Sequence, residues 1–500
     1  MAKRKKKTTL TMVTLLLALA FLIVFYLWYS NREETSGNEA ESKAKITLAE
    51  IDKNNIQQLH FQNKEVNLNL YLEGEVWLSQ EDPNRPINQD KVDNLLNVID
   101  RVEAERLVLE NPEDISEFGL DEPVLFLEAT SKDNQVVSLK IGSQTSTKEG
   151  YYGMVNDDPN VYLFSNNYRT GMDYRDVDMT EKEDLPSVAA EGVKHLTITM
   201  REGDNFELVN DPDNQISAPG ALIFPWIIYQ PYEEGVIADT AKVNEYLGNY
   251  ASLVYDHCVN YQAEDLSDYG LDQPYATIHI EYEQTNVITL EEPEVNPETG
   301  EEIKQKTEVE DKEFTLLIGD QNDDGDYFVR MVDSDAVYVM DASDVENMLE
   351  VDVFAMVSKH INMPNIANVD HITIQVEDSS YTMEIERNTI TNEEGEEETE
   401  EIYYYNGQVI EEDDFKGIYR RLISAAYDAP IKEELDITGL KPVITISYHI
   451  AESDKTVSSS YLPYDESFYI VDNGRKVRFY ADKRKIDDIV SAVVVFKPSE

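Results

Sequence analysis

The sequence predicts an α+β protein in which an N-terminal transmembrane helix is followed by three tandem repeats. Each repeat is expected to be an antiparallel sheet packed with one long and one or two short helices. Two observations lead to this prediction: a long apolar run without charge, and a helical stripe that recurs three times between strand-like segments. The expected parts are a cytoplasmic basic tail at 1–7, a transmembrane anchor at 8–29, a polar tether at 30–45, and repeat domains at 46–180, 186–352 and 361–500.

The N-terminal segment has the pattern of an uncleaved membrane anchor. Five basic residues occupy positions 3–7, and the 22 residues Thr8–Tyr29 carry no charge. As a helix they would span about 33 Å, enough to cross a hydrocarbon core of about 30 Å. A cleavable signal peptide is the alternative, but nine apolar residues follow Ala18–Ala20, where a signal peptide would already have ended. Because basic residues mark the cytoplasmic side, the chain after Ser30 is expected outside the cell membrane.

Composition excludes several classes of function. The chain has 100 acidic and 42 basic residues and a net charge of −58, so it would repel the phosphates of a nucleic acid. Cys258 is the single cysteine, which excludes an intrachain disulfide and a thiolate metal cluster. The hydrophobic fraction of 41% is sufficient for folded cores.

An apolar helical stripe recurs with the same spacing in each predicted repeat. Its residues fall at i, i+3, i+4, i+7 and i+10, which places them on one face of a helix. The three sets are Val92, Leu95, Leu96, Ile99 and Val102; Val243, Tyr246, Leu247, Tyr250 and Leu253; and Phe415, Ile418, Tyr419, Leu422 and Ala425. Alternating segments such as HLTITM and TIHIEY surround each stripe and predict half-buried antiparallel strands. Short helices are expected near the end of each repeat, as at Asp341–Glu350 and Asp482–Val493.

A short phrase follows each stripe. It reads EDLSDYGLDQP at 264–274, with near-copies at 113–123 and 433–442. We interpret it as a short helix with Asn111 as its cap and Pro112 as its first residue, closed by a left-handed Gly119 and a Leu120 that folds back on the last turn. Its aromatic or apolar residue is expected to anchor the helix to the core, namely Phe118, Tyr269 or Ile437. A binding role for the phrase is the alternative.

These features together resemble the family called domain of unknown function 4340. The resemblance rests on the ITL-x-x-ID opening at Ile46–Asp52, Trp77, the phrase at Gly119–Pro123, L-x-IG at Leu139–Gly142 and the later VYLF. It covers Ile46 to about Asp176 well, and recurs more loosely over 186–351 and 363–493. The third repeat departs from it, with Tyr461-Leu462-Pro463 in place of IG, so remodelled last strands are expected there.

The resemblance implies a bacterial envelope protein without enzymatic activity. Members of the family often accompany ABC transporter components of the gliding-motility auxiliary type, which implies an accessory or scaffold subunit with a protein partner in a membrane transport complex. The alternative is an extracellular ligand-binding or adhesion module for cell-wall polymer or calcium. No nucleic-acid partner and no cofactor are expected.

No catalytic, cofactor-binding or metal-binding residue is predicted. The chain has no G-x-x-x-x-G-K-[ST] loop, nucleophile elbow or H-E-x-x-H motif. His257 and Cys258 are neighbours whose side chains would point apart, so they are not expected to act as a pair. The histidines show no shared ligand spacing and are interpreted as ordinary packed or surface residues: His60, His195, His257, His279, His360, His371 and His449.

One acidic turn has the first half of a calcium-loop pattern. Asp320, Asn322, Asp324 and Asp326 place oxygens at alternate positions around Gly325, but Met331 stands where a bidentate carboxylate is needed. Two interpretations remain open, a solvated hairpin turn and a weak calcium site.

Three further segments stand out. The acidic stretches 291–313 and 391–401 are expected to be extended hairpin tips. The apolar insertion Pro219–Tyr232 is either an internal packing segment or an exposed docking patch.

Overall fold

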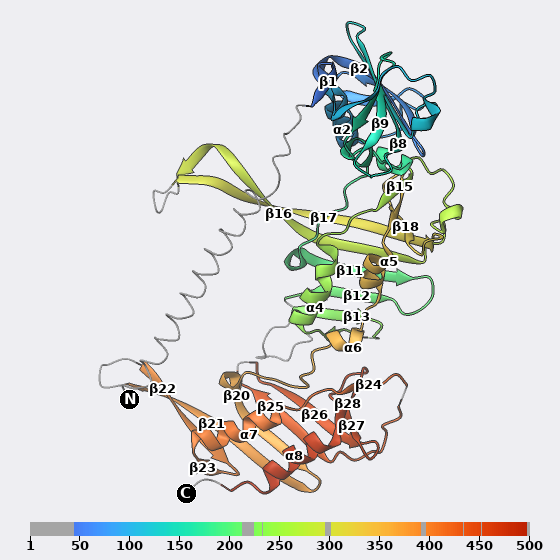
Figure 1. Cartoon of the computed structure of the whole chain (residues 1–500). Helices are drawn as coiled ribbons and strands as arrows, with labels where there is room; N and C mark the ends of the chain where they lie inside the picture. The colour runs from blue at the N-terminus through green and yellow to red at the C-terminus, as the bar shows by residue number, and fades with distance from the viewer. Residues whose placement is uncertain are drawn as a thin grey trace, which may run out of the picture. The chain divides into compact units, whose positions relative to one another are not determined.

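The computed structural model describes residues 45–212, 225–232, 234–295, 302–391, 397–433, 435–451 and 453–497. Within these ranges the strands form four antiparallel sheets (Figure 1). The chain divides into two compact units, residues 1–181 and 182–500. The first unit holds a two-stranded and an eight-stranded sheet, and the second unit holds two nine-stranded sheets.

The first unit is built around the eight-stranded sheet. Two other strands of the unit, β1 (Ile46–Glu50) and β5 (Arg101–Ala104), pair with each other in a separate two-stranded sheet. Its α-helices are α2 (Gln89–Asp100) and α3 (Asn167–Thr170). The order across the large sheet is β4 (Val76–Ser79), β3 (Asn67–Glu73), β2 (Ile56–Asn63), β7 (Leu125–Ser131), β8 (Val136–Gln144), β9 (Tyr151–Val155), β10 (Val161–Phe164) and β6 (Arg106–Leu109).

The second unit begins with a nine-stranded sheet that we call the second sheet. Its α-helices are α4 (Thr240–Leu247), α5 (Ala342–Leu349) and α6 (Val353–Met356). The strand order is β14 (Val236–Ile237), β13 (Trp226–Gln230), β12 (Phe206–Asn210), β11 (Val193–Met200), β16 (Ala276–Val295), β17 (Glu302–Gln321), β18 (Tyr327–Met331), β19 (Val337–Met340) and β15 (His257–Asn260).

The remaining nine strands form the third sheet. Its α-helices are α7 (Glu412–Leu422) and α8 (Lys483–Val494). The strand order is β23 (Gln408–Ile410), β22 (Glu397–Tyr405), β21 (Ser379–Thr391), β20 (Val369–Val376), β25 (Ile444–Ile450), β26 (Lys455–Pro463), β27 (Phe468–Asp472), β28 (Phe479–Asp482) and β24 (Ala429–Pro430).

The three large sheets share one strand order. In each, the first strands of the sheet run outward in sequence order from a central strand: β2 to β4 in the first sheet, β11 to β14 in the second and β20 to β23 in the third. The strand after the phrase, β7, β16 or β25, then pairs with the other side of that central strand, and three more strands follow it outward. The strand between the stripe helix and the phrase closes the far edge, as β6, β15 or β24.

The predicted α+β class is wrong, because the protein is mostly β. Strands account for 45% and helices for 19% of the structure. The helices are short, and they cover sheets of eight or nine strands, so strand pairing and not helix packing dominates each unit. The predicted transmembrane helix at 8–29 lies outside the described residues. Among the described residues, no helix is long and apolar enough to cross a membrane.

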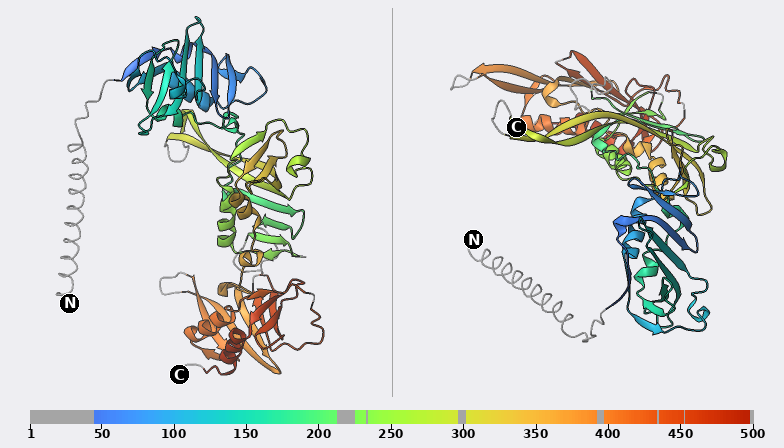
Figure 2. Two further views of the ribbon diagram at one scale, coloured as in Figure 1. Left: turned by 45° about the vertical axis from the view of Figure 1, so that its right-hand side comes forward. Right: turned by 90° about the horizontal axis from the view of Figure 1, so that it is seen from above.

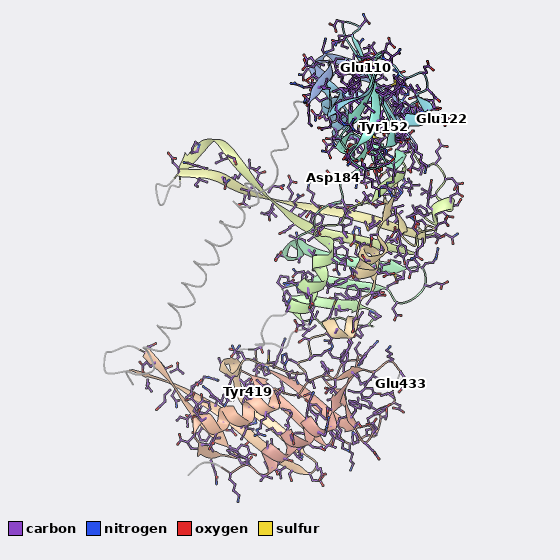
Figure 3. The ribbon with its side chains drawn as sticks, viewed as in Figure 1. Glu110, Glu122, Tyr152, Asp184, Tyr419 and Glu433 are labelled. Carbon is purple, nitrogen blue, oxygen red and sulfur yellow. The ribbon has the colours of Figure 1, made fainter. Side chains whose placement is uncertain are left out.

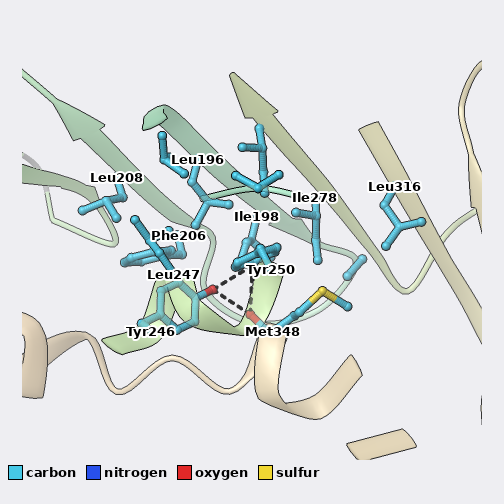
Figure 4. Packing of buried hydrophobic residues seen from close by; sticks show 14 of the residues in the cluster. Leu196, Ile198, Phe206, Leu208, Tyr246, Leu247, Tyr250, Ile278, Leu316 and Met348 are labelled. Atoms are coloured by element: carbon cyan, nitrogen blue, oxygen red, sulfur yellow. Dashed lines mark hydrogen bonds between the residues drawn. The ribbon is translucent and has the colours of Figure 1, made fainter. Parts of the chain in front are cut away.

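The helical stripes are buried, as predicted. Each stripe helix lies on one face of its sheet, and every stripe residue is less than 9% exposed. The last residue of each stripe lies beyond the helix, which corrects the prediction: Val102 is in β5, and Leu253 and Ala425 follow the helical segments. In the second sheet the stripe continues from α4 into a 3-10 turn at Gly248–Tyr250. There the Tyr246 hydroxyl donates to the Met348 carbonyl at 2.7 Å and lies 3.0 Å from the Tyr250 hydroxyl (Figure 4). These hydrogen bonds satisfy phenol groups that the core would otherwise leave unpaired.

The recurring phrase is a turn that ends in a left-handed glycine. Gly119 and Gly270 have φ of +65° and +64°, and each follows a single 3-10 turn, Ser116–Phe118 or Ser267–Tyr269. The turn begins at Ser116 and not at Pro112, because the Asp114 carboxylate accepts from the Ser116 N–H at 2.8 Å, so the predicted Asn111 cap is wrong. Phe118 packs edge-on against Tyr152, which is labelled in Figure 3, and Tyr269 packs edge-on against Phe328. These rings and Ile437 are only partly buried and lie outside the hydrophobic cores, so the predicted anchoring to the core is wrong.

A close approach of two backbones connects the phrase with the L-x-IG motif. A Cβ added to Gly142 would overlap the Phe118 carbonyl, and one added to Gly319 would overlap the Tyr269 carbonyl. In the third sheet Leu462 replaces this glycine, and nothing lies within 4 Å of a Cβ added to Gly439. The third sheet nevertheless keeps the strand order, so the predicted remodelling is confined to the turn.

Two hairpins extend beyond the sheets that carry them. We call the part of β16 and β17 beyond the Tyr282–Lys312 pair the long arm. Figures 1 and 2 show it running past the edge of its sheet. The second arm is the outer part of β21 and β22, where Asn388 pairs with Glu400. Both acidic stretches thus lie in extended hairpins, except for 296–301 and 392–396, which lie outside the described residues.

Candidate functional site

The outer face of the second sheet carries a cluster of histidines and carboxylates. Strand alternation buries residues such as Leu196, Ile278 and Phe314 on the inner face and directs their neighbours to solvent. The antiparallel register then aligns the polar residues in two rows across β11, β16 and β17. One row is His195, Glu281 and Glu313, and the other is Thr197, His279 and Thr315.

Three of these side chains are close enough to share one ion. Ligand atoms of His279, Glu281 and Glu313 all lie within 4.8 Å of one another, the only such group of three or more among the described residues. The His279 Nε2 atom lies 3.7 Å from Glu281 Oε1. His195 approaches the same carboxylate from the neighbouring strand, with its Nδ1 atom 3.7 Å from Glu281 Oε1.

The second nitrogen of each imidazole has a partner of its own. His279 Nδ1 lies 2.9 Å from the Thr315 hydroxyl, and His195 Nε2 lies 3.2 Å from Glu207 Oε1. A hydrogen bond at one ring nitrogen fixes the orientation of the ring and leaves the other nitrogen available. In both histidines the available nitrogen is the one nearer Glu281.

Glu281 and Glu313 are like charges directly opposite each other on paired strands. Such a pair destabilises a sheet unless a cation compensates it. The next pair outward, Glu283 and Asp311, is compensated by Lys194, whose Nζ atom lies 2.8 and 2.7 Å from the two carboxylates. Among the described residues, no lysine or arginine forms an ion pair with Glu281 or Glu313.

The corresponding positions of the other sheets differ. The first sheet has Gln58, Thr130 and Val136 where the second has His195, Glu281 and Glu313. The third sheet has His371, His449 and Thr456. The carboxylate pair with flanking imidazoles is therefore a feature of the second sheet alone.

The third sheet pairs its outer histidine with carboxylates instead. His449 Nδ1 lies 2.6 Å from Asp370, and its Nε2 atom lies 3.1 Å from Asp454. The Asp370 and Asp454 carboxylates raise the pKa of His449, because they stabilise the imidazolium. With both nitrogens occupied, this ring has no free lone pair for a ligand.

The Asp320–Asp326 segment forms a tight hairpin turn. Gly325 has a φ of +94°, and the Asn322 side chain accepts from the N–H groups of Asp324 and Asp326 at 2.9 and 3.0 Å. Asp320 lies 3.4 Å from Arg201, and Asp326 accepts from the Ala342 N–H at the start of α5. The oxygens of the pattern are thus directed to different partners, as expected for the solvated hairpin and not for a calcium loop.

Two other candidates are also placed. Cys258 is buried in the core of the second sheet, while the neighbouring His257 lies 2.7 Å from Asp256 on the outer side, so they do not form a pair. The described part of the apolar insertion, Pro225–Tyr232, contains β13 with Trp226 and Ile228 in the core, which supports internal packing. Residues 219–224 lie outside the described residues.

Sequence reasoning missed the outer cluster because its members are distant in the chain. His195 and Glu281 are brought together by the pairing of β11 with β16, and Glu313 by the pairing of β16 with β17. The available signal was a histidine and a glutamate two residues apart, His279 and Glu281, in an alternating strand. Two residues apart in a strand means the same face.

The family model for Domain of unknown function (DUF4340) matches residues 77–274 and 226–425. The two matches overlap, and together they cover more than half of the chain. Each begins at a strand with a buried tryptophan, Trp77 or Trp226, and extends into the following sheet, so the matches do not separate three copies. No curated protein and no solved structure matches the chain. The chain belongs to the DUF4340 family.

Proposed function

We propose that this protein is a non-catalytic envelope protein, held at the bacterial cell membrane by its N-terminal segment, that serves as an accessory or scaffold subunit of an ABC-type transport system. The charge-free run 8–29 behind a basic tail supports the location. We also infer that the three large sheets are tandem copies of one domain, and their common strand order supports this inference.

The observation that carries the scaffold role is the long arm. From Gln284 outward on β16, and up to Glu310 on β17, the described side chains are exposed or half-exposed, and no described helix or third strand covers them. An isolated two-stranded hairpin is only marginally stable in water. A ribbon of this length is therefore best explained by a partner that covers it.

The composition of the long arm indicates the chemistry of that partner. Four branched apolar side chains are exposed on it, namely Ile288, Val287, Ile303 and Val309, with exposures of 42, 62, 36 and 56%. Ten acidic residues but only two lysines lie in the segment 283–311. The complementary surface carries basic groups and apolar contacts, and we assign it to an extracytoplasmic part of a transport subunit.

The test is site-specific crosslinking in cells that carry the transport system. A photo-crosslinking residue replaces Val287 in the tagged full-length chain, and a matched control replaces Val409, which is 66% exposed but lies at the edge of the third sheet. We expect Val287, and not Val409, to crosslink to a permease subunit on its extracytoplasmic side. The same permease should co-purify in fixed ratio, together with its ATPase, after detergent extraction. Recovery of the full-length protein without transport subunits would contradict the proposal.

The second candidate is an extracellular ligand-binding or adhesion module for cell-wall polymer or a cation. The observation that favours it is the histidine–carboxylate cluster of the second sheet. The test is whether the purified full-length protein binds isolated cell wall. Binding that is lost when the charged side chains of this cluster are replaced by neutral ones would favour this function over the scaffold role.

A further inference from the structure

The outer cluster of the second sheet has the ligand types of a transition-metal site. Imidazole nitrogens and carboxylate oxygens are the common protein ligands of zinc outside cysteine-rich sites. His279, Glu281 and Glu313 already lie within 4.8 Å of one another. Two ligands bound to one tetrahedral zinc ion are about 3.4 Å apart, so small rotations of exposed glutamate side chains would complete the geometry.

We propose that His279, Glu281 and Glu313, with His195 as the fourth ligand, bind one divalent metal ion of the zinc class. The imidazoles are oriented for this role, because Thr315 and Glu207 hold one nitrogen of each ring and leave the other beside Glu281. A carboxylate that holds the outer nitrogen of a metal-bound histidine is a common supporting contact.

The charge arrangement supports the same assignment. Lysine compensates the Glu283–Asp311 pair, whereas the Glu281–Glu313 pair faces only imidazoles. A divalent cation would remove the repulsion between these two carboxylates. The first sheet, with Thr130 and Val136 at the corresponding positions, has no such repulsion and no such site.

The position of the ion implies a mechanical consequence. Glu281 on β16 and Glu313 on β17 are immediately inside the base of the long arm, and His195 belongs to the adjacent β11. One ion would therefore join three strands where the arm leaves the sheet. It would stiffen the base of the arm.

The test uses chelator-treated full-length protein in detergent, titrated with zinc chloride and, for spectroscopy, with cobalt chloride. Isothermal titration calorimetry is expected to show saturable zinc binding, and cobalt is expected to give the visible absorption of a site with nitrogen ligands. The variants Glu313→Gln and His279→Gln should each weaken zinc binding about tenfold or more. Glu313 is exposed, so its substitution leaves the core intact.

Two matched controls separate this site from general attraction to an acidic protein. Glu283→Gln removes the same charge two residues away, in the pair that Lys194 compensates, and His449→Gln removes an imidazole of the third sheet. Both controls should bind zinc like the unaltered protein. Hydrogen exchange of 277–283 and 311–315 should slow when zinc is added.

The proposal is overturned if the unaltered protein shows no saturable zinc binding. It is equally overturned if Glu313→Gln and His279→Gln bind zinc as tightly as the two controls do. Neither result bears on the crosslinks from Val287, so this inference and the proposed scaffold function fail independently.

Discussion

At the residue scale, the phrase that recurs three times depends on one glycine conformation. Gly119, Gly270 and Gly439 all have positive φ, which side chains rarely tolerate. Only the first two also lie against a neighbouring strand, since a Cβ there would overlap the side chain of Ser143 or Asp320. The same backbone conformation therefore has a different cost of substitution at Gly439 than at Gly119 and Gly270.

This difference predicts the effect of alanine substitution. Gly439→Ala should reduce the free energy of unfolding by about 1–2 kcal/mol, the usual cost of a left-handed L-residue. Gly270→Ala should reduce it more, because the Asp320 carboxylate must move away from Arg201 as well. Chemical denaturation, monitored by hydrogen exchange in β17 for Gly270→Ala and in β26 for Gly439→Ala, would measure both effects. An equal loss of unfolding free energy in the two variants would contradict the argument.

A second prediction at this scale concerns pH. Because Asp370 and Asp454 raise the pKa of His449 in the folded protein, protonation stabilises the fold. This stabilisation is fully present below the ordinary histidine pKa of about 6.5 and is lost as the pH rises through the raised value. The melting temperature of the unit 182–500, compared between the unaltered protein and His449→Gln, should differ at pH 5.5 and converge at high pH. The control is His60→Gln, whose ring contacts Asn67 and not a carboxylate. A pH-independent difference would exclude this mechanism.

At the element scale, the long arm contributes little to the stability of the sheet that carries it. Its strands pair with each other, while the core begins at Tyr282 and Phe314, which are 5% exposed. The arm is thus free to serve a partner without loss of the fold.

Shortening the arm tests this separation. Replacing residues 285–309 with Asn-Gly joins Gln284 to Glu310, which are already paired, through a two-residue turn suited to a hairpin. The free energy of unfolding should change by no more than about 0.5 kcal/mol, as for surface changes elsewhere. Recovery of transport subunits should be lost, while zinc binding should persist because Glu281 and Glu313 remain. A large fall in stability would show that the arm belongs to the folding core.

At the scale of the whole molecule, the second and third sheets share one compact unit. Phe479 of β28 is 3% exposed and packs with Tyr232 and Phe354 of the second sheet region. Glu234 accepts from the Val477 N–H at 3.1 Å, and Arg475 donates to the Gly235 carbonyl. Apolar and charged contacts therefore join the two sheets.

A further prediction is that removing one of these contacts lets the second and third sheets unfold separately. Although burial opposes it, the Val477 N–H and the Arg475 charge lower the pKa of Glu234. The contact should thus be present above the ordinary glutamate pKa of about 4.3 and weaken as the pH falls through the lowered value. Calorimetry at pH 7 should show the two sheets unfolding together, and Glu234→Gln or Phe479→Ala should separate the transitions. A single unchanged transition in both variants would mean that other contacts couple the sheets.

The sequence determined the local features of this protein. Helical spacing identified the buried stripes, and glycine chemistry identified the turn of the phrase, because both depend on neighbours within about ten residues. The same reasoning overestimated the helical part. It counted helices and strands separately and could not show that the strands join into sheets of eight or nine.

Only the tertiary structure decided which distant residues meet. The register of β11, β16 and β17 brought His195, Glu281 and Glu313 together. A shift of one of these strands by one residue would have placed its member of the cluster on the opposite face of the sheet. The calcium pattern at Asp320–Asp326 failed for the complementary reason, since a spacing of oxygens along the chain does not fix the direction in which they point. Spacing along the chain determines local conformation, whereas a binding site depends on strand pairing that no local pattern encodes.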